Sequence, residues 1–229
     1  MSTLRLPALR SFAIALGLSS ALGLFLLAAR IWFTGNRQYG FLAWNLLLAW
    51  IPLGFALVAA RRLAHSDRLS RWSGWSSLAA WLLFFPNAPY IFTDFIHFRR
   101  VVNVPWWFDL GMLLTFAATG LLLGLASLLV AHRTVAALAG PKAGWVFAGT
   151  STLLCGFGIY LGRFQRWNTW DVLSDPLGIA YDVAHRLVFP LEHPRAWGVT
   201  LLFGGLMAAL YLAFHALTQL GTSPERHEA

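Results

Sequence analysis

The sequence predicts an all-α protein, a polytopic bundle of membrane helices with one interfacial amphipathic helix. Three observations predict this class. The 229-residue chain is 58% hydrophobic and only 11% charged, whereas soluble proteins carry about 25% charged residues. Its apolar residues form long uncharged runs, several of which reach the roughly 20 residues that a helix needs to cross a bilayer. Its 12 Trp and 18 Phe fit the same class, because aromatic rings collect at membrane interfaces.

Six segments meet the length requirement for a spanning helix. In chain order they cover about residues 11–33, 40–60, 76–95, 107–131, 143–164 and 197–220. The first follows Arg5 and Arg10, as a signal peptide would. Its apolar core exceeds the ~7–15 residues of a signal sequence, so we expect a retained helix. We expect one transmembrane domain over residues 1–221 and a disordered polar tail over 222–229.

The third segment contains the most informative stretch of the chain, FFPNAPYIFTDFIH. Pro86 and Pro89 bracket Asn87, and each proline removes a backbone donor, so the helix should kink or break here. Within a membrane, broken backbone persists only where protein or a wet cavity satisfies the freed polar groups. The segment then ends in two ionisable residues, Asp94 and His97. This combination predicts a functional site.

The long link between the fifth and sixth segments contains its own helix, at about residues 176–189. Asp175 followed by Pro176 is typical of an N-cap with proline at the first helical position, and Pro190 ends the run. The apolar residues recur at three- and four-residue intervals: Leu177, Ala180, Ala184 and Leu187. Such a stripe predicts a helix lying along the membrane surface. A re-entrant hairpin is the alternative.

The charge pattern indicates membrane lipids as partners and excludes a separate nucleic-acid-binding domain. The net charge is +8, but the arginines flank apolar runs, where they favour topology signals and anionic-lipid contact. Nothing in the sequence indicates an oligomeric state. Cys155 is the single cysteine and lies in an apolar run, so we expect a small buried hydrophobe.

Six spans would place both termini on one side of the membrane. Basic residues divide nearly evenly between the two faces, but the link after the second segment contains Arg61, Arg62, Arg68 and Arg71. This cluster favours cytoplasmic termini. Whatever the orientation, the same parity gathers one set of polar residues on one face: Asn45, Asn87, Asp94, His97, Asp109, Arg163, Arg166, Asn168 and Asp171. This asymmetry is the strongest functional indication in the sequence.

The four acidic and imidazole groups of this set are the candidate catalytic residues: Asp94, His97, Asp109 and Asp171. Asp94 and His97 are three residues apart, which places them on one face of a continuous helix. A carboxylate and an imidazole can form an acid–base pair or ligate a divalent metal, although nothing in the sequence requires a metal. Asp109 or Asp171 would supply a further ligand. The alternative is a polar helix cap, with Asp94 paired to an arginine.

The candidate substrate-binding residues are Asn45, Asn87, Tyr90, Arg163, Arg166, Trp167 and Asn168. Arg163 and Arg166 are three residues apart at a predicted helix end, where they could clamp a phosphate or carboxylate or simply favour the helix dipole and the interface. Asn45 and Asn87 could contact a substrate or serve as hydrogen-bonding glue between helices. Two glycine pairs, Gly120/Gly124 and Gly158/Gly162, indicate close helix packing. Phosphate-loop, nucleophile-elbow and H-E-x-x-H motifs are absent.

At four segments the chain resembles a family of uncharacterised bacterial integral membrane proteins known only as a domain of unknown function. The segments are WNLLLAWIP from Trp44, FFPNAPYIFTDFIH from Phe84, PWWFD from Pro105 and GIYLGRFQRWNTWD from Gly158. The resemblance implies a multi-pass protein of the bacterial inner membrane and carries no mechanism with it.

The leading functional hypothesis is a lipid- or envelope-linked enzyme that binds an anionic headgroup at one membrane face. An enzyme predicts that Asp94, His97 and one of the two arginines face a common pocket. The alternatives are a small transporter, in which polar groups would continue towards the opposite face, and an accessory or structural membrane component.

Overall fold

The computed structural model describes residues 6–98 and 104–220, so the predicted tail lies outside the described residues. Every regular element in these ranges is a helix, which confirms the predicted fold class. The elements are α1 (Leu6–Thr34), α2 (Phe41–Leu63), α3 (Arg68–Phe84), α4 (Asn87–Tyr90), the 3₁₀ helix η1 (Ile91–His97), α5 (Trp106–Ala139), α6 (Pro141–Phe164), α7 (Asp171–Ser174), α8 (Pro176–Val188), the 3₁₀ helix η2 (Pro190–Glu192) and α9 (Pro194–Leu220).

Five helices are long and apolar enough to cross a membrane: α1 from Ser11, α2, α5, α6 and α9. The chain is therefore a multi-pass membrane protein. The expected third span differs from the other five because it is divided. Its helical residues begin at Arg68, well before residue 76, and α3 ends at Phe84, after which α4 and η1 follow.

The break in the third segment follows from its prolines. After Pro86, the Ala88 N–H donates to the Phe85 carbonyl at 3.2 Å in place of the Phe84 carbonyl. The Asn87 side chain donates to the Phe84 carbonyl instead, at 3.0 Å. The Asn87 side chain thus gives the Phe84 carbonyl the hydrogen bond that it loses at the break. A backbone carbonyl in apolar surroundings needs such a partner.

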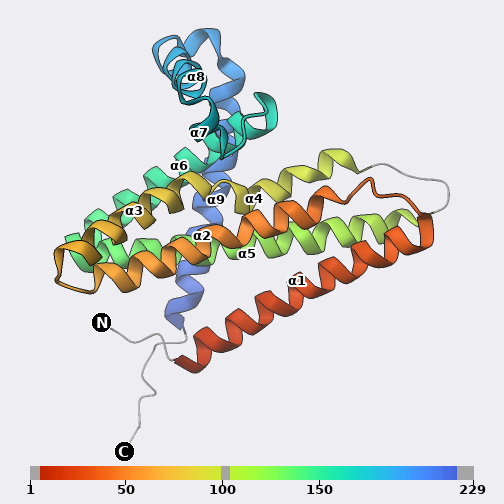
Figure 1. Ribbon diagram of the computed structural model, residues 1–229, viewed down its shortest axis with the longest axis horizontal. Coiled ribbons are helices and arrows are strands. Elements are labelled where there is room, and N and C mark those ends of the chain that lie inside the picture. The colour runs from red at the N-terminus through yellow and green to blue at the C-terminus, as the bar shows by residue number, and fades with distance from the viewer. Residues whose placement is uncertain (1–5, 99–103, 221–229) are drawn as a thin grey trace, which may run out of the picture.

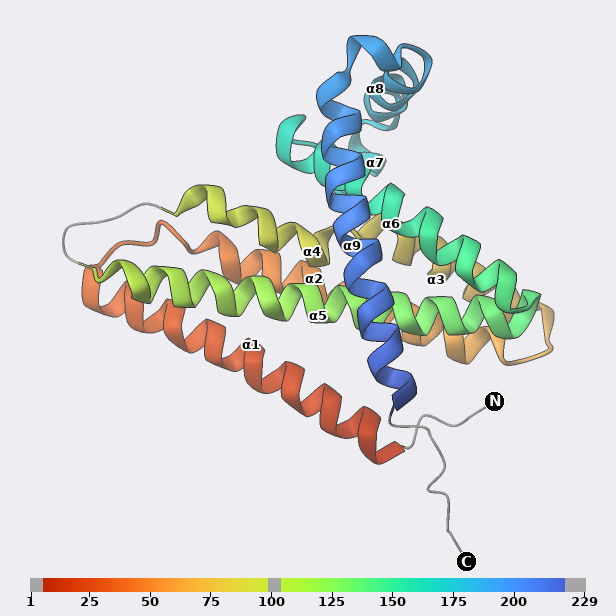
Figure 2. The same ribbon diagram turned by 180° about the vertical axis from the view of Figure 1, so that it is seen from behind.

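Helices α1, α2 and α5 extend along the longest axis of the molecule, and α9 crosses α5 (Figure 1). Here α1, α2 and α5 lie together, while α3, α4 and η1 return along α2. Helix α9 packs on α6, and α7 and α8 lie beyond one end of this pair (Figure 2). The Phe12 and Phe214 rings lie 6.1 Å apart, so the start of α1 and the end of α9 are neighbours.

Two apolar cores hold the bundle together. One joins α2, α3, α5, α6 and α9 around Trp81, Phe85 and Leu128. It includes Cys155, which is fully buried as expected. The other joins α1, α2, α4, η1 and α5 around Leu42 and Phe116.

Four glycines allow the broken segment to fit between α5 and α6, namely Gly120, Gly124, Gly158 and Gly162. A Cβ atom on Gly120 would lie 2.5 Å from the Ala88 carbonyl oxygen. One on Gly158 would lie 2.5 Å from Pro86 Cγ. The two predicted glycine pairs therefore pack against residues 86–91 from opposite sides. This close packing between α5 and α6 holds the break in position.

Helix α8 matches the helix expected at about residues 176–189. The Asp175 side chain caps it by accepting a hydrogen bond from the Gly178 N–H at 2.9 Å. Its apolar stripe is exposed in part: Leu177 is 81% and Leu187 56% accessible. An exposed apolar stripe of this kind is what a helix at a membrane surface would present.

Candidate functional site

A buried ion pair between η1 and α6 forms the centre of the candidate site. Asp94 is 1% exposed and pairs with the Arg163 guanidinium through its Oδ1 atom. Its Oδ2 atom accepts a hydrogen bond from Asn45 Nδ2 on α2 at 2.8 Å. Three separate segments of the sequence therefore meet at one carboxylate. Both Asp94 oxygens have partners, as a buried charge requires.

Arg163 makes several further contacts. Its Nε and Nη2 atoms donate to Thr93 Oγ1 at 2.9 and 2.6 Å. The guanidinium carbon lies 4.2 Å from the centre of the Tyr90 ring, a cation–π arrangement. Arg163 Nη1 lies 3.2 Å from His97 Nε2. The guanidinium is thus occupied by protein groups.

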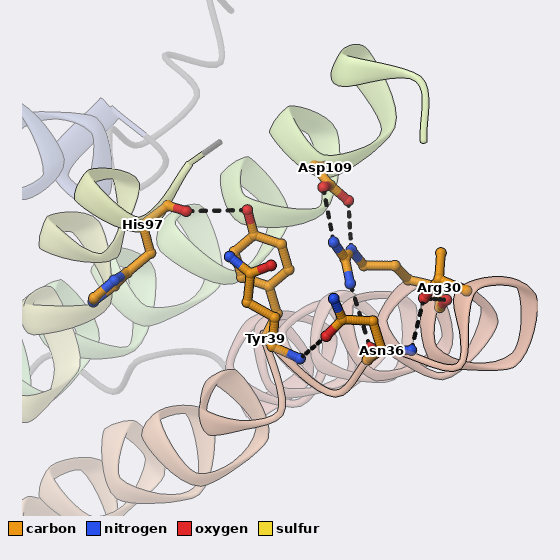
Figure 3. Close-up of polar contacts among 7 residues, drawn as sticks. Arg30, Asn36, Tyr39, His97 and Asp109 are labelled. Carbon is orange, nitrogen blue, oxygen red and sulfur yellow. Dashed lines mark hydrogen bonds and ion pairs between the residues drawn. The ribbon is translucent and has the colours of Figure 1, made fainter. Parts of the chain in front are cut away.

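His97 is fixed at the edge of this cluster. Arginine only donates, so the hydrogen bond between them has Arg163 Nη1 as the donor and His97 Nε2 as the acceptor. The ring packs edge-on to Phe41 at 5.1 Å. The His97 carbonyl accepts from the Tyr39 hydroxyl at 3.1 Å (Figure 3). Arg163 therefore stands beside both Asp94 and His97.

Asp109 lies in a different ion pair. Arg30 Nε and Nη2 donate to its two oxygens at 2.7 and 3.2 Å (Figure 3), and both side chains are at most 2% exposed. The Arg30 guanidinium also lies 4.5 Å from the centre of the Tyr39 ring. Tyr39 therefore connects this pair to His97, but the structure does not bring Asp109 to Asp94. The bidentate pair fastens α1 to α5.

The Asp171 side chain makes only local hydrogen bonds among the described residues. Its Oδ2 atom accepts from the backbone N–H of Asn168 at 2.7 Å and from Asn168 Nδ2 at 3.2 Å, and its Oδ1 atom accepts from Ser174 at 3.2 Å. The backbone hydrogen bond from Asn168 is the main reason that the pKa of Asp171 lies below its usual value. These contacts place Asp171 in the turn that begins α7.

Arg163 and Arg166, which could have formed a clamp, do not share a helix face, because α6 ends before Arg166. The helix stops at Phe164, and Arg166 takes a left-handed conformation with φ of 62°. The Trp167 N–H turns back to the Leu161 carbonyl at 3.2 Å. The spacing of three would place Arg163 and Arg166 on one face only in a continuous helix. Arg163 is directed into the bundle, whereas Arg166 is exposed.

A pocket of about 220 Å³ adjoins the Asp94–Arg163 pair, between α2, the broken third segment, α6 and the loop before α7. Five predicted binding residues line it: Asn45, Asn87, Tyr90, Trp167 and Asn168. Its other walls include the apolar side chains Leu48, Leu83 and Leu161. Trp44 and Trp170, whose rings pack edge to face at 6.3 Å, also belong to the lining. None of the described residues that line it is charged.

The two asparagines present the same chemical group to this pocket. Asn45 uses its NH₂ to donate to Asp94, and Asn87 uses its NH₂ to donate to the Phe84 carbonyl and, at 2.9 Å, to Thr169 Oγ1. Each amide therefore keeps its carbonyl oxygen, which accepts no hydrogen bond from the residues that the structure describes. The pocket thus offers hydrogen-bond acceptors.

A second polar cluster, which the sequence analysis did not identify, fastens α8 beside the pocket. Trp167 Nε1 donates to Asp182 Oδ2 at 2.7 Å, and Asp182 pairs with Arg186 at 3.1 Å. Arg186 Nε donates to the Tyr160 hydroxyl at 3.2 Å. Burial raises the pKa of Asp182, but the hydrogen bonds from Trp167 and Arg186 together bring it below its usual value. The spacing of Asp182 and Arg186, four residues apart, was a signal for this pair.

The opposite end of the bundle contains a separate cluster of buried aromatic and imidazole groups. His132 Nδ1 lies 2.5 Å from the Tyr211 hydroxyl, and the His132 and His215 rings stack at 5.6 Å. Between this cluster and the pocket lies the apolar core around Phe85 and Leu128. Among the described residues, this apolar core therefore separates the two polar clusters.

The fold and pocket define the class of the protein: a multi-pass membrane protein with an uncharged polar pocket at one end of its helices. Within this class, residues 44–210 match the family model described as "Protein of unknown function (DUF1361)". The match covers most of the chain, and the protein belongs to this family. Comparisons with curated proteins and with solved structures gave no match.

Proposed function

We propose that this protein binds a membrane amphiphile, with the polar headgroup in the pocket between α2, the broken third segment and α6. The observation that carries the proposal is the lining of the pocket. One part consists of amide and indole groups and the other of leucine side chains. A lipid-like molecule likewise has a polar headgroup and an apolar tail. Ligand sites in general combine apolar walls with a few polar groups that fix the orientation of the ligand.

The headgroup that suits this lining carries hydrogen-bond donors. The free acceptors of Asn45 and Asn87 match hydroxyl or amine groups, and the exposed indole rings of Trp44 and Trp170 suit the face of a sugar or an ammonium group. An anionic headgroup, the expectation from Arg163 and Arg166, is less well supported. Arg163 is neutralised by Asp94, and neither arginine belongs to the pocket lining.

The Asp94–Arg163 pair would then position the wall of the pocket. Asn45 donates to Asp94, and the Tyr90 ring stacks on Arg163, and both residues line the pocket. The carboxylate orients the Asn45 amide, because a carboxylate accepts only from its NH₂ group. In this proposal Asp94 and Arg163 are positioning residues.

A lipid- or envelope-modifying enzyme acting on the same amphiphile is the second candidate. The observation in its favour is that Asn45 and Tyr90, which line the pocket, contact Asp94 and Arg163. A transporter is less favoured, because a path from the pocket to the other end of α6 would have to pass the apolar core that includes Ala148, Cys155 and Ile159.

Binding can be tested by native mass spectrometry of lipids that remain bound to the purified protein. Leu48→Trp would fill the pocket from α2, and Leu57→Trp places the same indole on the exposed face of that helix, where Leu57 is 41% accessible. The proposal expects a bound amphiphile in the wild type and in Leu57→Trp, and its loss in Leu48→Trp. Equal retention by both variants would exclude the pocket as the binding site.

Catalysis can be tested by lipid profiling of a deletion strain. The strain is complemented with the wild type, Asp94→Asn, His97→Ala or Arg163→Met, and Arg166→Ala is the exposed control. A modifying enzyme predicts an altered lipid that the wild type and Arg166→Ala restore. Full complementation by the other three variants would rule out the enzyme.

We further propose that the protein lies in the bacterial inner membrane with both termini in the cytoplasm. The arginine-rich link between α2 and α3 supports this orientation, and the Phe12–Phe214 contact supports an even number of crossings. The divided third segment would supply the sixth crossing. Alkaline phosphatase fused after Ala60 should then be inactive, and a fusion after Phe98 should be active. The reverse pattern would invert the orientation.

A further inference from the structure

We propose that His185, Glu192 and His193 form a divalent-metal site that fastens the end of α8 to the start of α9. One potential ligand atom from each of the three side chains lies within 4.8 Å of the others. His185 Nδ1 and His193 Nε2 are 2.8 Å apart. The cluster belongs neither to the pocket nor to the Asp94–Arg163 pair.

The ligand set is suited to zinc or a similar transition metal. Two imidazole nitrogens and one carboxylate form a three-ligand site whose fourth position is open to water. Tetrahedral bonds of 2.0–2.1 Å place two ligand nitrogens about 3.4 Å apart, so the two rings need to separate by only about half an ångström. Imidazole binds a metal in its unprotonated form, so binding should weaken at acid pH.

The backbone holds these side chains in a tight turn. The Phe189 N–H donates to the His185 carbonyl at 2.9 Å, and the Glu192 N–H donates to the Phe189 carbonyl at 3.1 Å. The His193 N–H donates to the Pro190 carbonyl at 3.2 Å. Both histidines are half-buried and Glu192 is exposed, so an ion has direct access from solvent to ligands that are already close together.

The nearby cations do not oppose the ion strongly. Arg186, next to His185, is paired with Asp182 on the pocket side of α8. Arg195 lies over the Phe164 ring, with 5.9 Å between the guanidinium carbon and the ring centre. Glu192 makes no hydrogen bond through its carboxylate within the described part of the chain, so this group is available as the anionic ligand.

A metal at this turn would influence the position of α8 relative to the pocket. Ile179 of α8 lines the pocket, and Asp182 holds Trp167, which lines it as well. A bond between the two ends of the turn would therefore restrain one wall. The metal proposal itself stands on the three side chains and is independent of any ligand in the pocket.

The test uses the full chain in detergent, purified through a tag that contains no histidine. Titration with Co²⁺ is followed by visible absorption, and Zn²⁺ is then added as competitor. We expect one Co²⁺ per chain with ligand-field bands of a four-coordinate site, displaced by Zn²⁺. His185→Ala and His193→Ala should each weaken binding more than the roughly 10–100-fold that loss of an outer-shell partner costs. The matched control His65→Ala removes an exposed histidine at the end of α2 and should bind as the wild type does.

Thermal unfolding provides a second readout that does not depend on the variants folding identically. Metal that binds only the folded state raises the unfolding temperature, so Zn²⁺ should stabilise the wild type and His65→Ala but neither ligand variant. Absence of saturable binding to the wild type would overturn the proposal. So would a loss in His65→Ala equal to that in the ligand variants.

Discussion

Replacing Arg163 with Met should destabilise the protein strongly, because it leaves the Asp94 carboxylate buried without its cation. Asp94 is 1% exposed and would keep only the Asn45 hydrogen bond. Breaking a buried ion pair by removing one partner costs about 3–5 kcal/mol. Arg163→Met also removes the contacts to Thr93 and to the Tyr90 ring, so a value at the upper end of this range is expected.

A double-mutant cycle isolates the pair from these other losses. In Asp94→Leu/Arg163→Met both charges are gone, and a buried pair replaced by apolar groups is often close to neutral in stability. We therefore expect the double variant to be more stable than the sum of the single changes predicts, with a coupling free energy of about 0.5–3 kcal/mol. Arg166→Met, an exposed arginine at the same end of α6, should change stability by less than about 0.5 kcal/mol.

The measurement is equilibrium unfolding by SDS in mixed micelles, followed by tryptophan fluorescence. In a thermal scan the single change would lower the midpoint by about 6–20 °C, taking 2–4 °C for each kcal/mol in a chain of this size. Additive single changes would show that Asp94 and Arg163 do not interact in the folded protein. A cost for Arg163→Met no larger than that for Arg166→Met would refute the buried pair as a stabilising feature.

Three further predictions concern the surroundings of the pocket. Gly158→Ala places a methyl group 2.5 Å from Pro86 and should cost about 1–3 kcal/mol by overpacking. Gly149→Ala on the same helix has open space and should be neutral or stabilising in the same unfolding assay, so an equal cost for both would contradict the close approach. Tyr211→Phe removes the hydroxyl that contacts His132 and should cost about 1–3 kcal/mol if it leaves the imidazole unsatisfied; an unchanged unfolding midpoint would argue against this contact. The pKa of Asp182 in the folded protein is lowered from its ordinary value of 3.8. The ionised carboxylate therefore accepts the hydrogen bond from the Trp167 indole at pH values above 3.8, and this hydrogen bond is lost when the pH falls through the lowered pKa. The indole N–H resonance in ¹⁵N spectra should shift only in that acid range, and an Asp182→Asn variant should not show the transition.

The sequence predicted the fold class and most of the helices because hydrophobic periodicity and length act locally. The prolines at 86 and 89 predicted a break, and the two glycine pairs predicted close packing. The sequence could not show that these glycines pack against the broken segment itself. That result depends on which helices become neighbours, a choice made by side-chain packing across the whole bundle.

The convergence of polar residues at one end was also predicted, since parity alone brings alternate helix ends to the same face. The number of crossings does not determine which of these side chains pair with one another. Asp109 pairs with Arg30, which the sequence analysis had not selected, and Asp171 closes a local turn. A carboxylate takes whichever donor the packed backbone places within about 3 Å, and this distance cannot be obtained from residue spacing.

The sequence by itself determined that the protein is a membrane helix bundle with a broken third segment and a polar end. Only the tertiary structure decided that Arg163 turns inward while Arg166 stays outside, because α6 ends between them. It also decided the chemistry of the pocket, because the partners of Asn45 and Asn87 occupy their NH₂ groups and leave their carbonyl oxygens. A side chain's type is encoded locally, but the face it presents to a ligand depends on neighbours that are distant in sequence.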